Sequence, residues 1–318
     1  MKLPFSFSLK FVFRLLFPGF VVTLALFPAL RTLCDSLRAN IQSEYIIMLS
    51  TIMIGWLFIV LDMHIYMALE GRRYWPGWLR ELFQRAEERR LSRLHANYEK
   101  IKLTDQVKYA EISVELRRFP LNNDGEPIAT FPTRLGNLLT AYEEYPLRVY
   151  GMDSVFYWYR IWLAVSEDLR EHIDSQQAIA DSSIYMTAAL LVAGLIVIIY
   201  AVQQQMPFAW VNHLPETQIL LFIGFMSFVL SYLIYRMSLH LHASFGELYK
   251  SMFDMHRGKV PVDEIVDRIA TLTKDKNIKN SSSSEKYMVT WRYLHNYKIK
   301  TEQGIVSAAK LSNDDQAE

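Results

Sequence analysis

The longest uncharged stretch of the chain lies between Asp181 and Glu216, and it limits the fold more than any other feature. Within it, residues 184–202 are almost wholly aliphatic. A bilayer core about 30 Å thick is crossed by roughly 20 apolar residues of helix, because unpaired backbone groups are costly in hydrocarbon. The stretch therefore predicts a membrane-spanning helix.

Two more stretches predict spans from their apolar composition. Residues 219–235 are equally apolar and are followed by Arg236. Residues 45–61 form another, and that helix can continue past Asp62 to Leu69 if the acid is sheltered or lies near the interface. Both are long enough to cross the bilayer.

The first thirty residues combine basic residues with an apolar run, as a secretory signal does. The run ends at Arg31 without a small-x-small cleavage pattern, so residues 15–30 are interpreted as a retained helix. Because Pro18 and Pro28 interrupt it, this span is expected to be kinked or partly interfacial, with Arg14 reaching toward water.

The arrangement of Lys and Arg predicts the orientation of the spans. Seven arginines follow the second span: Arg72, Arg73, Arg80, Arg85, Arg89, Arg90 and Arg93. Residues 203–217, which connect the third and fourth spans, contain no Lys or Arg. Since basic residues gather on the cytoplasmic side, we expect both termini and the long central loop in the cytoplasm.

The expected fold is an all-α integral membrane protein with four transmembrane helices and a helical cytoplasmic region. Residues 1–69 hold the first two spans, 70–182 the cytoplasmic region, 183–237 the last two spans, and 238–318 a helical extension and flexible tail. In that tail, DKNIKNSSSSEK is expected to be a flexible linker and KLSNDDQAE to be disordered.

The cytoplasmic region contains two candidate contact surfaces. Residues 76–101 predict an amphipathic helix with a basic beginning, which either contacts lipid or a partner together with Arg72 and Arg73, or packs on its neighbours. The aromatic residues around Trp158 and Trp162 lie against headgroups or a partner, or form a core among the same helices.

Four ionisable residues are expected near the inner ends of the spans: Asp62, His64, His240 and His242. At that depth they could form a metal or proton-relay site. Burying ionisable groups is costly, and a function often explains why a chain keeps them there. However, residues two apart on a helix point about 200° from each other, so only one of each pair can face a common site. Otherwise these residues reach water or pair with nearby arginines.

Composition and motifs argue against several classes of function. The 34 basic and 33 acidic residues nearly cancel, which does not favour a nucleic-acid partner. The single cysteine, Cys34, forms no internal disulfide and no cysteine-rich metal site. There is no P-loop, G-x-G-x-x-G, H-E-x-x-H or G-x-S-x-G motif. We therefore expect no enzyme activity, no cofactor and no bound metal.

One motif block in the cytoplasmic region is distinctive. It contains Pro132–Asn137 (P-T-R-L-G-N), Tyr145-Pro146, Tyr150-Gly151 with Asp153, and Trp158 with Arg160. The block resembles a pattern in uncharacterised bacterial multi-span membrane proteins, as does FGELYKSMFDMHR at 245–257. The chain differs from that family in having Phe245 before the glycine and a long polar tail. The resemblance implies a bacterial origin, hence the inner membrane, but no established activity.

The motif also has a physical interpretation. Thr133, Arg134 and Asn137 are polar groups around Gly136, where backbone can approach closely. Arg134 is expected to pair with Asp153 and hold two helices together, or to bind an anionic headgroup or phosphate.

Two functional hypotheses follow. The first is a membrane-anchored interaction or scaffold protein whose cytoplasmic helices recognise a partner; lipid and either a protein partner or a second copy are expected to bind. The second is an oligomeric channel or membrane-perturbing effector gated by the cytoplasmic region, with Ser227, Ser231 or Tyr232 facing an axis. A weaker third is a lipid enzyme centred on Asp62, His64, His240 and Arg134.

Overall fold

The protein is almost wholly helical in the computed structural model, which describes residues 12–101, 105–205, 211, 214–274, 276–294, 299–301 and 304–306. The chain forms two compact units. The first comprises Met1–Arg93, Ala129–Asn137 and His172–Phe245, and the second comprises Leu94–Ile128, Leu138–Glu171 and Gly246–Glu318. The predicted disordered end, KLSNDDQAE, lies outside the described residues.

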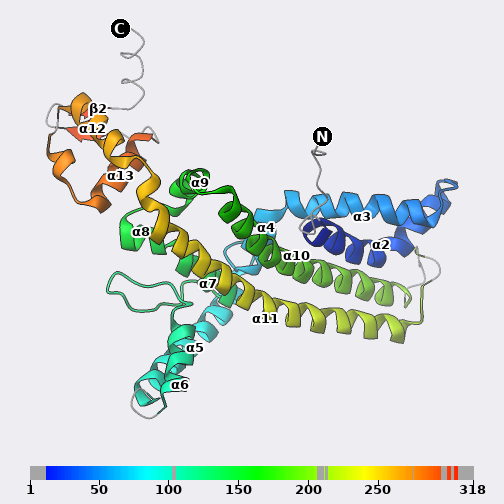
Figure 1. Cartoon of the computed structure of the whole chain (residues 1–318). Coiled ribbons are helices and arrows are strands. Elements are labelled where there is room, and N and C mark those ends of the chain that lie inside the picture. The colour runs from blue at the N-terminus through cyan, green and yellow to red at the C-terminus, as the bar shows by residue number, and fades with distance from the viewer. Residues whose placement is uncertain are drawn as a thin grey trace, which may run out of the picture. The chain divides into compact units, whose positions relative to one another are not determined.

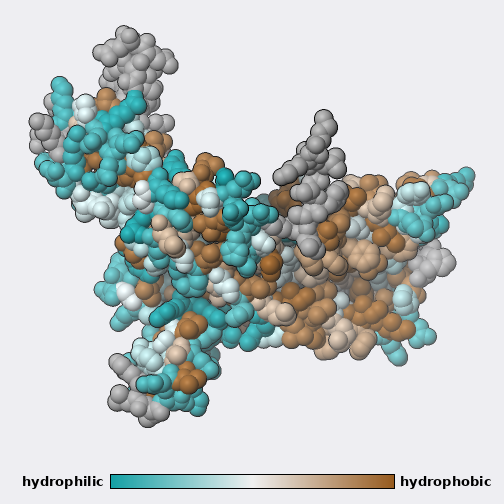
Figure 2. Space-filling view, viewed as in Figure 1, coloured by the Kyte–Doolittle hydropathy of each residue, from teal (hydrophilic) through white to brown (hydrophobic). Residues whose placement is uncertain are grey.

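The helices of the first unit include four that are long and apolar enough to cross a membrane, at Val12–Ser36, Ser43–Val60, Glu167–Gln203 and Thr217–Lys259. They are built from η1 (Val12–Leu16), α2 (Phe17–Ser36), α3 (Ser43–Val60), α10 (Glu167–Gln203) and α11 (Thr217–His256), while α4 (Asp62–Leu69) follows α3 (Figure 1). Their surface is predominantly hydrophobic (Figure 2). The four-helix prediction is confirmed for length and composition, and the first helix is longer than predicted.

Glycines allow α2 and α3 to cross closely. A Cβ added to Gly19 would lie 2.8 Å from the backbone nitrogen of Gly55, and one added to Gly55 would lie 2.9 Å from Cγ of Leu15. Real side chains do not approach so closely, so both positions require glycine. Small residues of this kind let helix backbones pack tightly where the hydrophobic effect gives no help.

The apolar parts of α10 and α11 also run side by side (Figure 1). Ser231 is buried and its hydroxyl donates to the carbonyl oxygen of Thr187, 2.9 Å away. The Ser227 hydroxyl donates within its own helix, to the carbonyl oxygen of Ile223. Ser231 is therefore engaged in helix packing rather than presented to a pore within this chain.

The second unit is built from shorter helices: α6 (Gln106–Leu116), α8 (Tyr145–Tyr150), α9 (Ser154–Ala164), η2 (Arg257–Lys259), α12 (Val262–Thr273), η3 (Lys276–Asn280) and α13 (Ser283–Leu294). Helices α5 (Gly77–Ile101), α7 (Arg134–Glu143), α10 and α11 contribute to both units. Two short antiparallel strands, β1 (Ile299–Thr301) and β2 (Gly304–Val306), follow.

Aromatic stacking forms the core of the second unit. The ring of Trp158 stacks on Tyr249 with centroids 4.5 Å apart, and Phe253 beside them is fully buried. The Tyr157 hydroxyl donates to the carbonyl oxygen of Tyr287 at 2.6 Å, which joins α9 to α13. Trp158 therefore packs in a core among these helices, which is one of the two interpretations predicted for the aromatic residues.

Most described residues of the segment expected to be a flexible linker are helical, in η3 and at the start of α13. Ser282 and Glu285 form a capping box, in which the Ser282 hydroxyl accepts from the Glu285 backbone and the Glu285 carboxylate accepts from the Ser282 backbone. Lys279 and Lys286 then form ion pairs with α12, at 3.1 and 2.9 Å. The serine run therefore includes the start of α13.

Candidate functional site

The four ionisable residues near the span ends separate into two pairs. His242 is 2% exposed, and Asp62 is half-buried and accepts a hydrogen bond from the Tyr185 hydroxyl at 2.7 Å. His64 is exposed, with Nδ1 2.5 Å from the Tyr74 hydroxyl, and His240 is also exposed. Asp62 and His242 thus face the helices of the first unit, while their neighbours two residues away do not.

A buried polar chain, which we call the Tyr66 network, surrounds His242. The Tyr66 hydroxyl lies 2.5 Å from Oδ1 of Asp181 and 3.0 Å from Nε2 of His242. Arg14 forms an ion pair with the other carboxylate oxygen of Asp181. Nδ1 of His242 lies 2.8 Å from the carbonyl oxygen of Ser238. The network therefore joins η1, α4, α10 and α11.

The Tyr66 network corrects one expectation and reveals residues that the sequence analysis missed. Arg14 was expected to reach toward water, but its guanidinium instead pairs with a carboxylate whose side chain is 11% exposed. Tyr66 and Asp181 were not predicted as site residues. One signal was available, since Tyr66 lies one helical turn after Asp62 on the polar end of the second span.

Within the described part of the chain, no three His, Cys, Asp or Glu side chains are grouped as metal ligands. The contacts of the Tyr66 network are instead those of a hydrogen-bonded chain ending in an ion pair.

The P-T-R-L-G-N motif binds the backbone just after α4, in an arrangement of Thr133, Gly136 and Asn137 that we call the clasp. The Thr133 hydroxyl donates to the carbonyl oxygen of Glu70 at 2.9 Å and accepts from the backbone of Gly136 at 3.0 Å. A Cβ on Gly136 would lie 2.6 Å from that same Glu70 oxygen, so only glycine allows this approach. Asn137 bonds the backbone nitrogen and oxygen of Phe131, at 2.8 and 2.9 Å.

Arg134 and Arg72 have partners within the protein. Arg134 lies 3.7 Å from Glu87 on α5. The Asp153 carboxylate caps α9 by accepting from the backbone of Phe156. Arg72 pairs with Glu70, and its guanidinium lies 4.7 Å from the centre of the Phe131 ring. Arg73 is exposed. Because Arg134 and Asp153 belong to different units, their expected pairing stays a prediction.

Helices α9 and α6 of the second unit expose apolar side chains. On α9, Val155, Tyr159 and Leu163 recur every four residues and are 79%, 68% and 73% exposed, whereas Trp162 is half-buried. On α6, an apolar seam of Val107, Ala110 and Val114 lies along a shallow depression of about 780 Å³.

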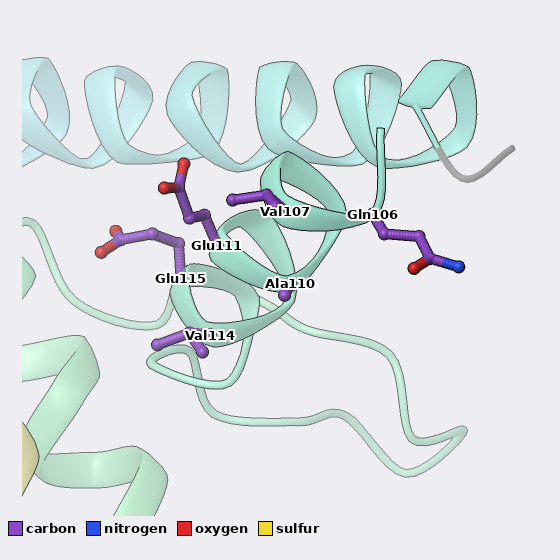
Figure 3. A pocket seen from close by; sticks show the side chains of 6 residues that line it. All are labelled: Gln106, Val107, Ala110, Glu111, Val114 and Glu115. Atoms are coloured by element: carbon purple, nitrogen blue, oxygen red, sulfur yellow. The ribbon is translucent and has the colours of Figure 1, made fainter. Parts of the chain in front are cut away.

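Figure 3 shows the side chains around the α6 seam. Glu111 and Glu115 lie next to each other at one margin of it, and Gln106 lies where the helix begins. Val107 is 71% exposed and Val114 is 50% exposed. This surface was not predicted, although the spacing of three and then four residues is visible in the sequence.

Comparison with protein-family models, curated proteins and solved structures finds no match for this chain. The resemblance to bacterial multi-span proteins therefore stays a prediction.

Proposed function

We propose that this is a membrane-anchored interaction protein that recognises a protein partner through helices outside its four apolar ones. The observation that carries the proposal is the α6 seam of Val107, Ala110 and Val114. Apolar residues spaced by three and then four form one stripe along a helix, the pattern through which two helices pack. The small side chain of Ala110 at the middle permits a close approach.

The margin of the seam favours a partner of defined chemistry. Glu111 and Glu115 place carboxylates beside the apolar residues, although Glu115 also pairs with Arg118. An acidic margin attracts Lys or Arg and opposes contact with anionic lipid headgroups. The expected occupant is therefore an amphipathic helix of another protein, with an apolar stripe flanked by basic residues. Membrane lipid is the proposed partner of the four apolar helices instead.

We also propose that the chain lies in the inner membrane of a bacterium, with the second unit and both termini in the cytoplasm. The seven arginines after the second span support this orientation, as does the absence of Lys and Arg from residues 203–217. Oligomer formation is not required by the proposal, because a single α6 seam offers a complete helix-binding stripe.

Site-specific photo-crosslinking in cells tests the proposed function. A photoreactive residue at Val114 of the full-length protein should give one discrete adduct with another protein. The same residue at Lys108, which is exposed on α6 but does not line the depression, should not. The identified protein is then purified, and Val114→Lys should weaken its binding at least tenfold, whereas Lys108→Gln should leave the affinity unchanged.

Three outcomes would contradict the proposal. Equal crosslinking from Val114 and Lys108 would mean that the seam is not a specific surface. An adduct of two copies of this chain would replace the separate partner by self-association. Ion flux into liposomes that contain only this protein would favour the channel hypothesis.

A further inference from the structure

The histidine of the Tyr66 network has one ring nitrogen whose protonation is fixed by its neighbour. Nδ1 of His242 lies 2.8 Å from the carbonyl oxygen of Ser238. A carbonyl oxygen accepts hydrogen bonds and cannot donate them, so Nδ1 must carry a proton. In a neutral imidazole the other nitrogen, Nε2, is then an acceptor.

The tyrosine has one proton and two neighbours that need it. The hydroxyl of Tyr66 lies 2.5 Å from Asp181 Oδ1 and 3.0 Å from His242 Nε2. If His242 is neutral and Asp181 is ionised opposite Arg14, both neighbours are acceptors. One of the two contacts then sets lone pairs against each other, which is unfavourable where water cannot intervene.

One additional proton satisfies both contacts. With that proton on Nε2, His242 donates to the Tyr66 oxygen, and the Tyr66 hydroxyl donates to Asp181. With it on Asp181, the carboxylic acid donates to Tyr66, and Tyr66 donates to Nε2. We infer that Asp181, Tyr66 and His242 form a proton-binding site that passes a proton between α10 and α11.

The transfer between the two arrangements is balanced. The Nε2–H bond of the imidazolium breaks and its proton binds the Tyr66 oxygen, while the Tyr66 O–H bond breaks and its proton binds Asp181 Oδ1. The imidazolium and carboxylate become a neutral imidazole and a carboxylic acid, and the tyrosine hydroxyl is regenerated. No other reactant is needed.

The surroundings make occupancy of the site depend on pH. The ionisable groups around it are Arg14 from η1, Asp62 and Glu70 from the α4 region, and Tyr185 from α10. His242 is 2% exposed and Asp181 is 8% exposed, so burial opposes the added charge. Hydrogen bonding favours the loaded state. Because the loaded state holds one more proton than the empty one, we expect the site to load as the pH falls.

Nuclear magnetic resonance of the full-length protein in detergent, labelled with ¹⁵N-histidine, tests the inference. The His242 signal is assigned by its loss in His242→Gln, among the eight histidines of the chain. Between about pH 8 and pH 4, Nε2 should change from unprotonated to protonated while Nδ1 stays protonated. In Tyr66→Phe, the midpoint should fall by about one pH unit, because the acceptor of the Nε2 proton is lost. His64→Gln is the matched control, and the His242 midpoint should not move.

A second measurement follows the carboxyl group of Asp181 directly and uses one variant for its assignment. On acidification, infrared spectra should show a protonated carboxylic acid whose band is absent from Asp181→Asn. The inference is overturned if Nε2 does not titrate in this range, if its midpoint is the same in Tyr66→Phe, or if no Asp181 acid band appears.

Discussion

Arg14 and Asp181 form an ion pair between η1 and α10, 167 residues apart in the sequence. The Asp181 side chain is 11% exposed and the Arg14 side chain is 34% exposed. The more buried Asp181 carboxylate therefore depends on the ion pair for stabilisation of its charge more than the Arg14 guanidinium does. The pair fixes the beginning of the first apolar helix against the third, and this relationship leads to the first prediction.

Arg14→Gln should destabilise the protein by about 2 kcal/mol or more, because it leaves a buried carboxylate without its cation. The double variant Arg14→Gln with Asp181→Asn should recover part of that loss, because the unpaired charge is gone. Thermal unfolding in detergent measures both effects. If the double variant is no more stable than the single one, the pair does not hold Asp181 as argued.

Gly55→Ala should loosen the crossing of α2 and α3, because the added Cβ would lie 2.9 Å from Leu15 Cγ. Overpacking of this kind costs about 1–3 kcal/mol. Gly77→Ala at the start of α5 is the matched control, since a Cβ there meets nothing within 4 Å. The two thermal midpoints are compared in the same detergent, and equal values would argue against a close crossing.

Local pattern predicted the elements better than it predicted their partners. The apolar runs identified four helices because length and hydropathy alone decide whether a helix can cross a bilayer. Arg134 was expected to pair with Asp153 or to bind an anionic group, and its contact with Glu87 was not predicted, because the choice of partner depends on three-dimensional packing. The Ser282–Glu285 capping box has a recognisable sequence pattern, but the composition of the serine-rich segment predicted a flexible linker.

The Tyr66 network also separates what local pattern predicts from what depends on long-range contacts. Helical geometry predicted that only one of His240 and His242 could face a common site, a constraint set by local structure. The hydroxyl between His242 and Asp181 was not predicted, because no single-sequence rule places residue 66 beside residues 181 and 242.

Asn137→Ala should destabilise the clasp by about 2–3 kcal/mol, because buried backbone groups lose their partners. Asn137 is 1% exposed and bonds both backbone groups of Phe131. Asn122→Ala is the control, since it removes hydrogen bonds from an exposed turn. Protease cleavage within residues 119–133 should accelerate in Asn137→Ala more than in Asn122→Ala; the reverse order would contradict the clasp.

Tyr145 should make the free energy of unfolding fall as the pH rises into the alkaline range. Burial raises the pKa of the Tyr145 hydroxyl well above its usual value, and hydrogen bonding to Asp254 raises it further. The folded state therefore keeps a proton that the unfolded state loses above about pH 10, so this contribution is complete below that pH and is lost as the pH rises through the folded pKa. Thermal unfolding should show a shallower alkaline decline in Tyr145→Phe than in the unaltered protein. Tyr159→Phe, at a position 68% exposed, should decline as the unaltered protein does, and an equal decline in all three would exclude Tyr145 as the cause.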